Sequence, residues 1–487
     1  MWMSEMNQQK LKLENKIRHQ HKKFTRLTFF VMSLFYFPSS YAETNVQDQT
    51  ACPQRPSILT NRWQENWDVL KNSCVVKKTG DQFKYIPFKE NSYISLGANI
   101  RERFELNNSA KFGTAKNSND QYLIQRLQMH VDARLAEQWQ IFAQFIDARA
   151  YDKNTVGSTD QNRFDLEQAF IAWQHSLNNG TFKFRVGRQE MAFDLQRFIS
   201  NREGPNVRQA FDGVWADYEY QDWRFLGYMT RPVQIDMTGT LNDFSDHDLR
   251  FSGFRIDKQN VLGGELSGYY SRYVRNHATF PSVSGNEVRD LYDLRHMGSK
   301  NNLDWDVEAM LQYGDIADQS IQAWALSAIT AYHLKDQPYS PKLAVQIDAA
   351  SGDKNPHDGK LNTFNQLFAN GSYFTLAGYS GYSNLIHIKP SITIQPNDQL
   401  TLMAALGLQW RQTTQDAIYF QGNSSMPKTA GQGSKWTGKY LQLRADQKVN
   451  SNLSMAIEAV HYDVGKTILN AGGKDANYLG VEMKYGW

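Results

Sequence analysis

The chain has 487 residues, enough for one large domain or for two or three ordinary ones. Hydrophobic residues make up 41% and the mean hydropathy is −0.60, and no apolar run approaches the roughly 20 residues of a membrane-spanning helix. The 53 basic and 50 acidic residues nearly balance, so the composition gives no support to nucleic-acid binding.

The first 42 residues resemble a secretory signal peptide. Seven basic residues precede an apolar stretch over 27–37, and Ser40-Tyr41-Ala42 offers a cleavage site with small residues at its two ends. We predict that residues 1–42 are removed; an amphipathic helix of a soluble protein is the alternative. The remaining chain carries 46 basic and 48 acidic residues, so any preference for anions must come from where the charges lie.

Residues 43–90 differ from the rest of the chain and are predicted to form a periplasmic extension. Asn61 and Gln64 have the spacing of a helix-capping box, and Trp63, Trp67 and Leu70 fall on one helical face. The extension is expected to cap or plug the following domain, or to float beside it.

Cys52 and Cys74 are the only cysteines, and both lie in this extension. Export to an oxidising compartment favours a disulfide between them. Two free thiols are the alternative.

From about Ser92 to Trp487, segments of some 10–15 residues alternate between polar and apolar positions. In the first segment, for example, Ile100 and Phe104 alternate with Arg101 and Arg103. A two-residue period predicts β-strands, and lipid outside with water inside sustains it over many strands. Segments 210–221 and 248–258 alternate poorly, so the facing of their residues is not predicted.

The connections between these segments alternate in length. Short turns are predicted near 137–138, 178–180, 221–222, 300–302, 396–398 and 450–452, with one short exception near 315–319. Longer polar loops are predicted at about 108–120, 152–163, 191–209, 234–248, 276–286, 351–381, 412–436 and 464–475. Short periplasmic turns and long external loops are typical of outer-membrane barrels. We therefore predict an all-β fold, a transmembrane antiparallel up-and-down β-barrel of about 18 strands over residues 91–487, with both termini on the periplasmic side.

Several stretches are similar to the alginate export family of outer-membrane barrels. They are Arg62-Trp63 with Trp67-Asp68-Val69-Leu70, Lys84-Tyr85-Ile86-Pro87, Ile94-Ser95-Leu96-Gly97, Arg101-Glu102-Arg103-Phe104-Glu105, Gln144 with Asp147-Ala148-Arg149, Gly187-Arg188-Gln189-Glu190, Phe211-Asp212-Gly213-Val214, Ser351-Gly352-Asp353-Lys354 and 363–368. The resemblance spans nearly the whole chain after residue 42. It implies an 18-stranded barrel and passive passage of a polyuronate through an arginine-lined constriction, but it does not name the cargo of this chain.

Ten arginines make up the predicted selectivity filter. They are Arg101, Arg103, Arg126, Arg134 and Arg185 on the polar faces, Arg149 and Arg188 assigned to the same faces, and Arg197, Arg202 and Arg208 in the 191–209 loop, which is expected to fold into the lumen. A guanidinium group keeps its charge and matches a carboxylate with paired donors, and rings of such charges select anions in channels. Carboxylates such as Asp306 and Glu308 are expected to anchor some of them. The alternative is a ladder of ion pairs that only neutralises buried charge.

No catalytic residues, metal ligands or cofactor are predicted. Asp353, Asn355 and Asp358 loosely resemble a calcium loop, but the spacing is wrong and the final Glu is missing, so a surface turn is expected.

Three functions remain open. The first is export of an anionic polysaccharide, the second is uptake of small anionic solutes such as aromatic or sugar acids, and the third is a barrel-borne hydrolase or adhesin. The expected partners are the anionic polymer or solute, outer-membrane lipid and lipopolysaccharide, the barrel-insertion machinery and, for an exporter, periplasmic export components. The expected location is the bacterial outer membrane.

Overall fold

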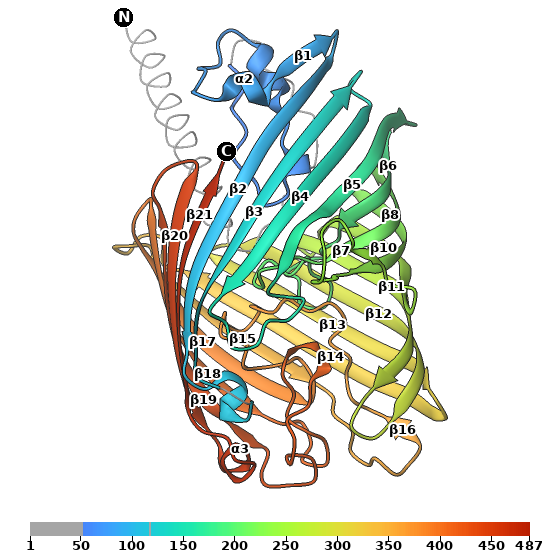
Figure 1. Ribbon diagram of the computed structural model, residues 1–487, viewed down its shortest axis with the longest axis vertical. Coiled ribbons are helices and arrows are strands. Elements are labelled where there is room, and N and C mark those ends of the chain that lie inside the picture. The colour runs from blue at the N-terminus through green and yellow to red at the C-terminus, as the bar shows by residue number, and fades with distance from the viewer. Residues whose placement is uncertain (1–51, 116–117) are drawn as a thin grey trace, which may run out of the picture.

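The protein forms a closed β-barrel with a small N-terminal extension at one end (Figure 1). The computed structural model describes residues 52–115 and 118–487, and the predicted signal peptide (1–42) lies outside the described residues. Over those ranges, 18 antiparallel strands form the ring, and β2 (Ser92–Asn107) pairs with β21 (Ala476–Gly486) to close it. The predicted fold class and number of strands are confirmed.

The barrel strands follow one another around the ring in chain order. Between β2 and β21 they are β3 (Asp120–Leu135), β4 (Trp139–Tyr151), β5 (Asn162–Leu177), β6 (Gly180–Glu190), β7 (Ala210–Tyr220), β8 (Trp223–Gln234), β10 (Leu249–Val261), β11 (Gly264–Thr279), β12 (Ser284–Lys300), β13 (Leu303–Ile316), β14 (Gln319–His333), β15 (Lys342–Ala350), β17 (Leu385–Asn397), β18 (Leu400–Trp410), β19 (Trp436–Lys448) and β20 (Leu453–Val464). Three short strands, β1 (Ile86–Lys89), β9 (Phe244–Ser245) and β16 (Lys360–Leu361), pair with β2, β8 and β14 respectively.

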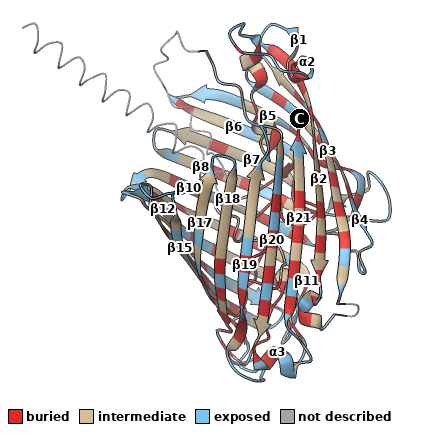
Figure 2. Ribbon diagram, turned by 90° about the vertical axis from the view of Figure 1, so that its left-hand side faces the viewer, coloured by how far each residue is buried: buried red, intermediate tan, exposed pale blue. Residues whose placement is uncertain are grey.

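Burial alternates along the strands, but polar residues are the buried ones. In β3, Arg126 and Gln128 are buried inside the barrel, whereas Met129 and Val131 are 40% and 42% exposed on its outside. Figure 2 shows this alternation as red and pale segments along neighbouring strands. A polar inside and an apolar outside are what a barrel surrounded by lipid requires.

One end of the barrel carries mostly short turns and the other carries the long loops. We call them the short-turn end and the long-loop end. The predicted loop at 276–286 is much shorter in the structure, because β11 runs to Thr279 and β12 begins at Ser284. The predicted short connection near 315–319 is confirmed between Ile316 and Gln319. In the ranges that the structure covers, no helix is both long and apolar enough to span a membrane.

The N-terminal extension lies at the short-turn end, at the top of Figure 1. It contains two short 3-10 helices (Arg62–Gln64 and Trp67–Lys71), α2 (Asp81–Lys84) and a disulfide between Cys52 and Cys74. The other helices, α3 (Lys466–Asn470) and the 3-10 turns Ala110–Gly113 and Gln421–Asn423, belong to loops at the opposite end.

The predicted helix-capping box is wrong. The Asn61 side chain makes no hydrogen bond to the helix that follows it, and its Oδ1 accepts one from Arg208 instead. The prediction that Trp63, Trp67 and Leu70 share one helical face is also wrong. Trp67 and Leu70 pack in a small core, but Trp63 points into the barrel, where its ring meets Phe170 edge-on with 6.1 Å between ring centroids.

Candidate functional site

The loop 191–209, between β6 and β7, folds into the lumen as predicted and crosses it. We call it the constriction loop. Soon after it leaves β6, the loop is attached to strands further around the ring. The Asp194 carboxylate accepts hydrogen bonds from Arg255 on β10 at 2.6 Å and from Arg295 on β12 at 2.8 Å. Asp194 is buried, and these two guanidinium groups hold the pKa of its carboxyl well below the usual range although desolvation opposes them.

Arg197 fixes the next part of the constriction loop to β13. Its side chain is fully buried and donates to Asp306 at 2.8 Å, to Glu308 and to the Tyr373 hydroxyl at 3.0 Å. Asp306 and Glu308 therefore anchor an arginine, as the sequence predicted. A buried ion pair of this kind loses several kcal/mol when one partner is removed, since the other charge is left without compensation.

The return part of the constriction loop, 203–206, is held by arginines of β2 and β3. Arg101 donates to the carbonyl oxygens of Glu203 and Pro205, both at 2.7 Å, and Arg103 donates to that of Gly204 at 2.8 Å. Arg126 pairs with the Glu203 carboxylate at 2.7 Å. These three predicted filter arginines face the lumen, but their donors hold the loop.

The loop returns to the wall of the barrel through Arg208. This arginine donates to Glu190 at the end of β6 and to Asn61 of the N-terminal extension, with 3.2 Å between Arg208 Nη2 and Asn61 Oδ1. The nearby carboxylates raise the pKa of Arg208 above its usual value although burial opposes this. The constriction loop is thus attached to three regions of the barrel wall and to the extension.

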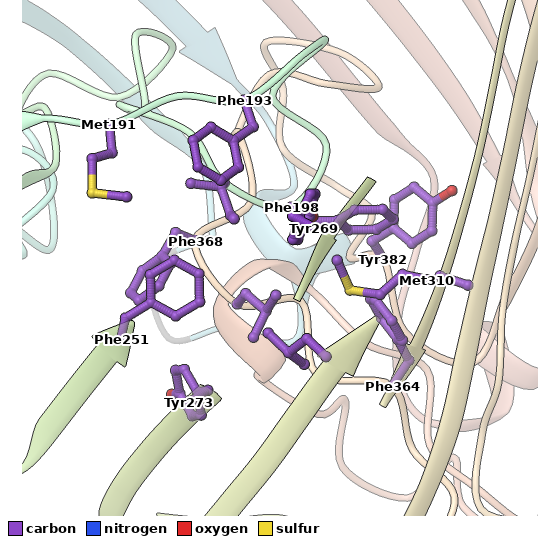
Figure 3. Packing of buried hydrophobic residues seen from close by; sticks show 14 of the residues in the cluster. Met191, Phe193, Phe198, Phe251, Tyr269, Tyr273, Met310, Phe364, Phe368 and Tyr382 are labelled. Atoms are coloured by element: carbon purple, nitrogen blue, oxygen red, sulfur yellow. The ribbon is translucent and has the colours of Figure 1, made fainter. Parts of the chain in front are cut away.

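Apolar side chains fill the space between the constriction loop and the long-loop end. Figure 3 shows Phe193 and Phe198 among aromatic residues of the wall and of the loop between β15 and β17. The Phe198 ring lies 5.4 Å from that of Phe364, and Ile199 forms a parallel bridge with Phe368. This part of the lumen is packed like a protein core.

A cavity of about 790 Å³ occupies the lumen on the other side of the constriction loop. We call it the vestibule. It is lined by residues of the extension, of the loop from Glu190 to Leu195 and of many strands near the short-turn end. Its size lies within the range of small-molecule binding sites, roughly 300–1,000 Å³.

The vestibule is not positively charged in total. Its lining includes ten acidic and eight basic residues. Most of the acidic groups have a cationic partner; Asp217, for example, pairs with Arg224 at 2.6 Å. Three lining cations have no carboxylate within 4.0 Å among the residues that the structure places: Arg185, Lys342 and Lys389.

These three cations lie on opposite walls. Arg185 is on β6, whereas Lys342 and Lys389 are on β15 and β17, eight and nine strands further around a ring of 18. An anion inside the vestibule therefore meets, on two sides, cations that have no direct carboxylate partner among the described residues.

Arg202 in the constriction loop is also uncompensated. Its backbone has φ of 57°, and its half-buried guanidinium has neither a hydrogen bond nor an ion pair with any residue of the described ranges. Burial lowers its pKa from the ordinary value. A partly desolvated cation without a partner is costly, and an anionic ligand would relieve that cost.

Two of the ten predicted filter arginines do not face the lumen. Arg149 lies on the outside of β4, half-exposed and paired with Asp147 at 2.6 Å. Arg188 lies on the outside of β6, where it pairs with Asp212 at 2.9 Å beneath residues of the loop between β8 and β10. Of the rest, Arg101, Arg103, Arg126, Arg134 and Arg185 face inward, and Arg197, Arg202 and Arg208 lie in the constriction loop.

Several inward-facing charges were missed. They are Arg224, Arg255, Arg295, Lys342 and Lys389. An acid two residues away marks some of them, as with Arg255 and Asp257, because residues two apart share a face of a strand. The same spacing joins Asp147 and Arg149 on the outside, so it identifies a shared face and not which face it is.

No metal centre is found. Over residues 52–115 and 118–487, no group of three or more His, Cys, Asp or Glu side chains is arranged to hold an ion. Asp353 and Asp358, which loosely resembled part of a calcium loop, accept hydrogen bonds from the backbone of Asn355 and Lys360, as residues of turns do.

Comparison with known proteins gives the family. The family model described as alginate export matches residues 92–482. No curated protein matches the chain. Among solved structures, OpdK, an outer membrane protein from Pseudomonas aeruginosa, is similar with a TM-score of 0.54 and 9% identity over 83% of this chain and 99% of its own. OccK5 (OpdH) from the same organism is similar with a TM-score of 0.52 and 12% identity over 82% of this chain and 98% of its own.

OccK2 (OpdF) from Pseudomonas aeruginosa, solved in complex with glucuronate, gives a TM-score of 0.54 and 11% identity over 82% of this chain and 98% of its own. At such identities the structural likeness shows the fold alone. The family match covers most of the chain, however, and the barrel fold agrees with it. This protein therefore belongs to the alginate export family and is a β-barrel channel of the bacterial outer membrane.

Proposed function

We propose that this channel passes small organic anions, sugar acids among them, and that the constriction loop limits the size of what passes. The observation that carries the proposal is the path of this loop. It crosses the lumen and is fastened to β10 and β12 at Asp194, to β13 at Arg197 and to β2 and β3 at 203–206. Such a loop narrows the lumen, and a narrowed lumen admits a compact solute more readily than a thick polymer.

Preference for anions would come from cations that lack a carboxylate partner. Most of the arginines in the lumen are paired with carboxylates or donate to carbonyl oxygens. Within the described ranges, the cations without a carboxylate partner are Arg202, Arg185, Lys342 and Lys389, and of these Lys389 donates to the carbonyl oxygen of Phe374 at 2.9 Å. Between walls of low dielectric constant, a few fixed charges raise the local concentration of the opposite ion. The similar barrel of OccK2, solved with glucuronate, supports a carboxylate as the class of solute.

The test is the reversal potential of the protein in planar bilayers under a KCl gradient. We expect the wild type to prefer chloride and Arg202→Gln to lose a measurable part of that preference. Arg149→Gln is the matched control, because Arg149 lies on the outer face with its own partner. A wild type that prefers potassium would overturn the proposal; equal reversal potentials for wild type and Arg202→Gln would remove Arg202 from it.

Export of an anionic polysaccharide is the second candidate, and membership of the alginate export family favours it. Block of the chloride current by long uronate chains and not by glucuronate would select export. A barrel that conducts no ions would instead favour a hydrolase or an adhesin.

A further inference from the structure

The N-terminal extension contributes a side chain to the vestibule. The backbone carbonyl of Trp63 accepts hydrogen bonds from Arg134 on β3 at 2.6 Å and from Gln140 on β4 at 2.9 Å. Its ring packs edge-on against Phe170 on β5. Three neighbouring strands thus fix this residue, and its indole lines the cavity.

The indole of Trp63 covers the guanidinium of Arg185. The Arg185 Cζ atom lies 3.8 Å from the centroid of the Trp63 ring and 4.6 Å from that of Phe170. Stacking on aromatic faces holds a guanidinium in place while its N–H donors, which lie in its plane, stay available at the edge.

Those donors are almost unused. The only hydrogen bond that the Arg185 side chain makes to the described part of the protein is long, 3.4 Å from Nη1 to the Gln189 side chain. Lys183, two residues earlier on the same inner face, is paired with Glu219 at 2.9 Å, and Arg134 is paired with Asp132 at 2.9 Å. The faces of the Arg185 guanidinium are thus covered by rings and its Nε is buried without a partner in the part of the chain that the structure describes, so Nη1 and Nη2 are the nitrogens that a solute can reach.

We propose that Arg185, held by Trp63 and Phe170, binds the carboxylate of a solute in the vestibule, and that the N-terminal extension completes this binding site. The inference rests on the proposed function and deepens it by naming the position where the anion is held. Gln64 and Gln174 line the same cavity and offer amide groups to the hydroxyls of a sugar acid. Lys342 and Lys389 add positive charge from the opposite wall.

The experiment measures block of the chloride current through the full-length mature protein in planar bilayers, with sodium glucuronate added on the side of the extension. Glucose is the neutral control for the sugar ring. We expect saturable block by glucuronate and none by glucose. Variants that insert and conduct are folded, so the assay carries its own control for folding.

The glucuronate concentration that blocks half of the current distinguishes the roles of Arg185, Lys183 and Trp63. Arg185→Gln is expected to raise it about ten-fold, since a charge-assisted bond to the carboxylate is lost. Lys183→Gln, the matched control on the same face of β6, is expected to leave it nearly unchanged. Trp63→Ala is expected to raise it less, and Trp63→Phe to restore most of the loss because it retains a ring, which a general structural defect would not do.

The outcomes distinguish this site from the channel function. Block that is unchanged in Arg185→Gln, or absent in an anion-selective wild type, overturns the vestibule site and leaves the channel for anions standing. A wild type that neither prefers chloride nor is blocked by glucuronate overturns both. Equal loss of block in Lys183→Gln and Arg185→Gln would show that only the total charge matters, which also overturns the site.

Discussion

The two ends of the lumen are filled in opposite ways. Towards the long loops, Phe198 meets Phe364 and Tyr382 of the loop between β15 and β17, and the interior is packed. Towards the short turns, charged and amide side chains surround an open vestibule of about 790 Å³. The constriction loop is the boundary between these two regions, so one segment of 19 residues (191–209) decides where water and solute can go.

The comparison also shows two uses of arginine. Arg101 and Arg103 hold the constriction loop in place and have few donors left. Arg126 holds it through Nη2 alone, and its Nε and Nη1 are buried without a partner among the residues that the structure places. Arg185, on the wall of the vestibule, keeps its donors. A count of arginines in a barrel therefore overstates the number that can meet a solute.

Removing the constriction loop is expected to have the largest effect, and that effect is on the conductance of the channel. Replacing residues 193–206 by a short Gly-Ser linker should raise the single-channel conductance several-fold, since these residues form the segment that crosses the lumen. Shortening the loop between β4 and β5 is the control. An unchanged conductance would show that the loops at 351–384 and 411–435 close the lumen without help.

Breaking one attachment should destabilise the packed region. Arg197→Met leaves the buried Glu308 without a cation and is expected to cost about 3–5 kcal/mol of unfolding free energy. Arg149→Met removes a half-exposed pair on the outer face and should cost less than about 1 kcal/mol. Urea unfolding in detergent, followed by tryptophan fluorescence, measures both. Similar losses for the two variants would mean that ion pairs in the lumen and on the outer surface contribute equally to stability.

The extension that completes the vestibule should depend on its disulfide. Cys52 and Cys74 close a loop of 22 residues, and losing such a link costs on the order of 3 kcal/mol in the chain-entropy model. In the double variant Cys52→Ser, Cys74→Ser, limited proteolysis should cut within residues 52–90 faster than in wild type, while the barrel keeps its melting temperature. Parallel loss of barrel stability would mean that the extension supports the whole fold.

The smallest expected effect is a pH dependence of how tightly the extension is docked. Burial lowers the pKa of Lys84 to about 7, and the nearby charge of Arg62 adds to this. The undocked form, with an ordinary lysine, binds more protons than the docked form between pH 7 and about 10.5. Docking should therefore strengthen as pH rises through that window and be weakest below it.

Hydrogen exchange of residues 60–85, corrected for the intrinsic rate at each pH, measures this dependence. Lys84→Met retains the length of the side chain without the charge and should flatten the pH profile. A wild-type profile that is already flat, or one of opposite slope, would show that Lys84 is not the group that titrates.

Much of the architecture was predictable from the sequence. The two-residue period along each strand arises because one face of the strand meets lipid and the other faces the lumen. The alternation of short and long connections arises because successive connections lie at opposite ends of the barrel. Both are local patterns in the sequence. The entry of the 191–209 loop, which carries Arg197, Arg202 and Arg208, into the lumen was also expected. Its points of attachment, such as Asp194 to Arg255, join residues far apart in the chain and carry no local signal.

The two misplaced arginines show where local patterns fail. In β4 the inner face carries Phe142 and Ile146, which are buried inside the filled barrel, so polarity does not distinguish the two faces. On the outer face of β6, Arg188 is covered by the loop between β8 and β10, which shields a charge where lipid would otherwise lie. Polarity identifies the inner and outer faces of a strand only where the inner face contacts water and the outer face contacts lipid with no loop covering it.

The same extension also touches the place where the ring closes. Arg62 donates to the carbonyl oxygen of Trp487, at 2.9 Å, and to the side chain of Asn99 on β2, so it bridges the first and last strands. This contact cannot exist until β21 has met β2. Arg62 can therefore make both contacts only in a closed barrel. The time at which residue 62 becomes protected from solvent would mark the final step of assembly in the membrane.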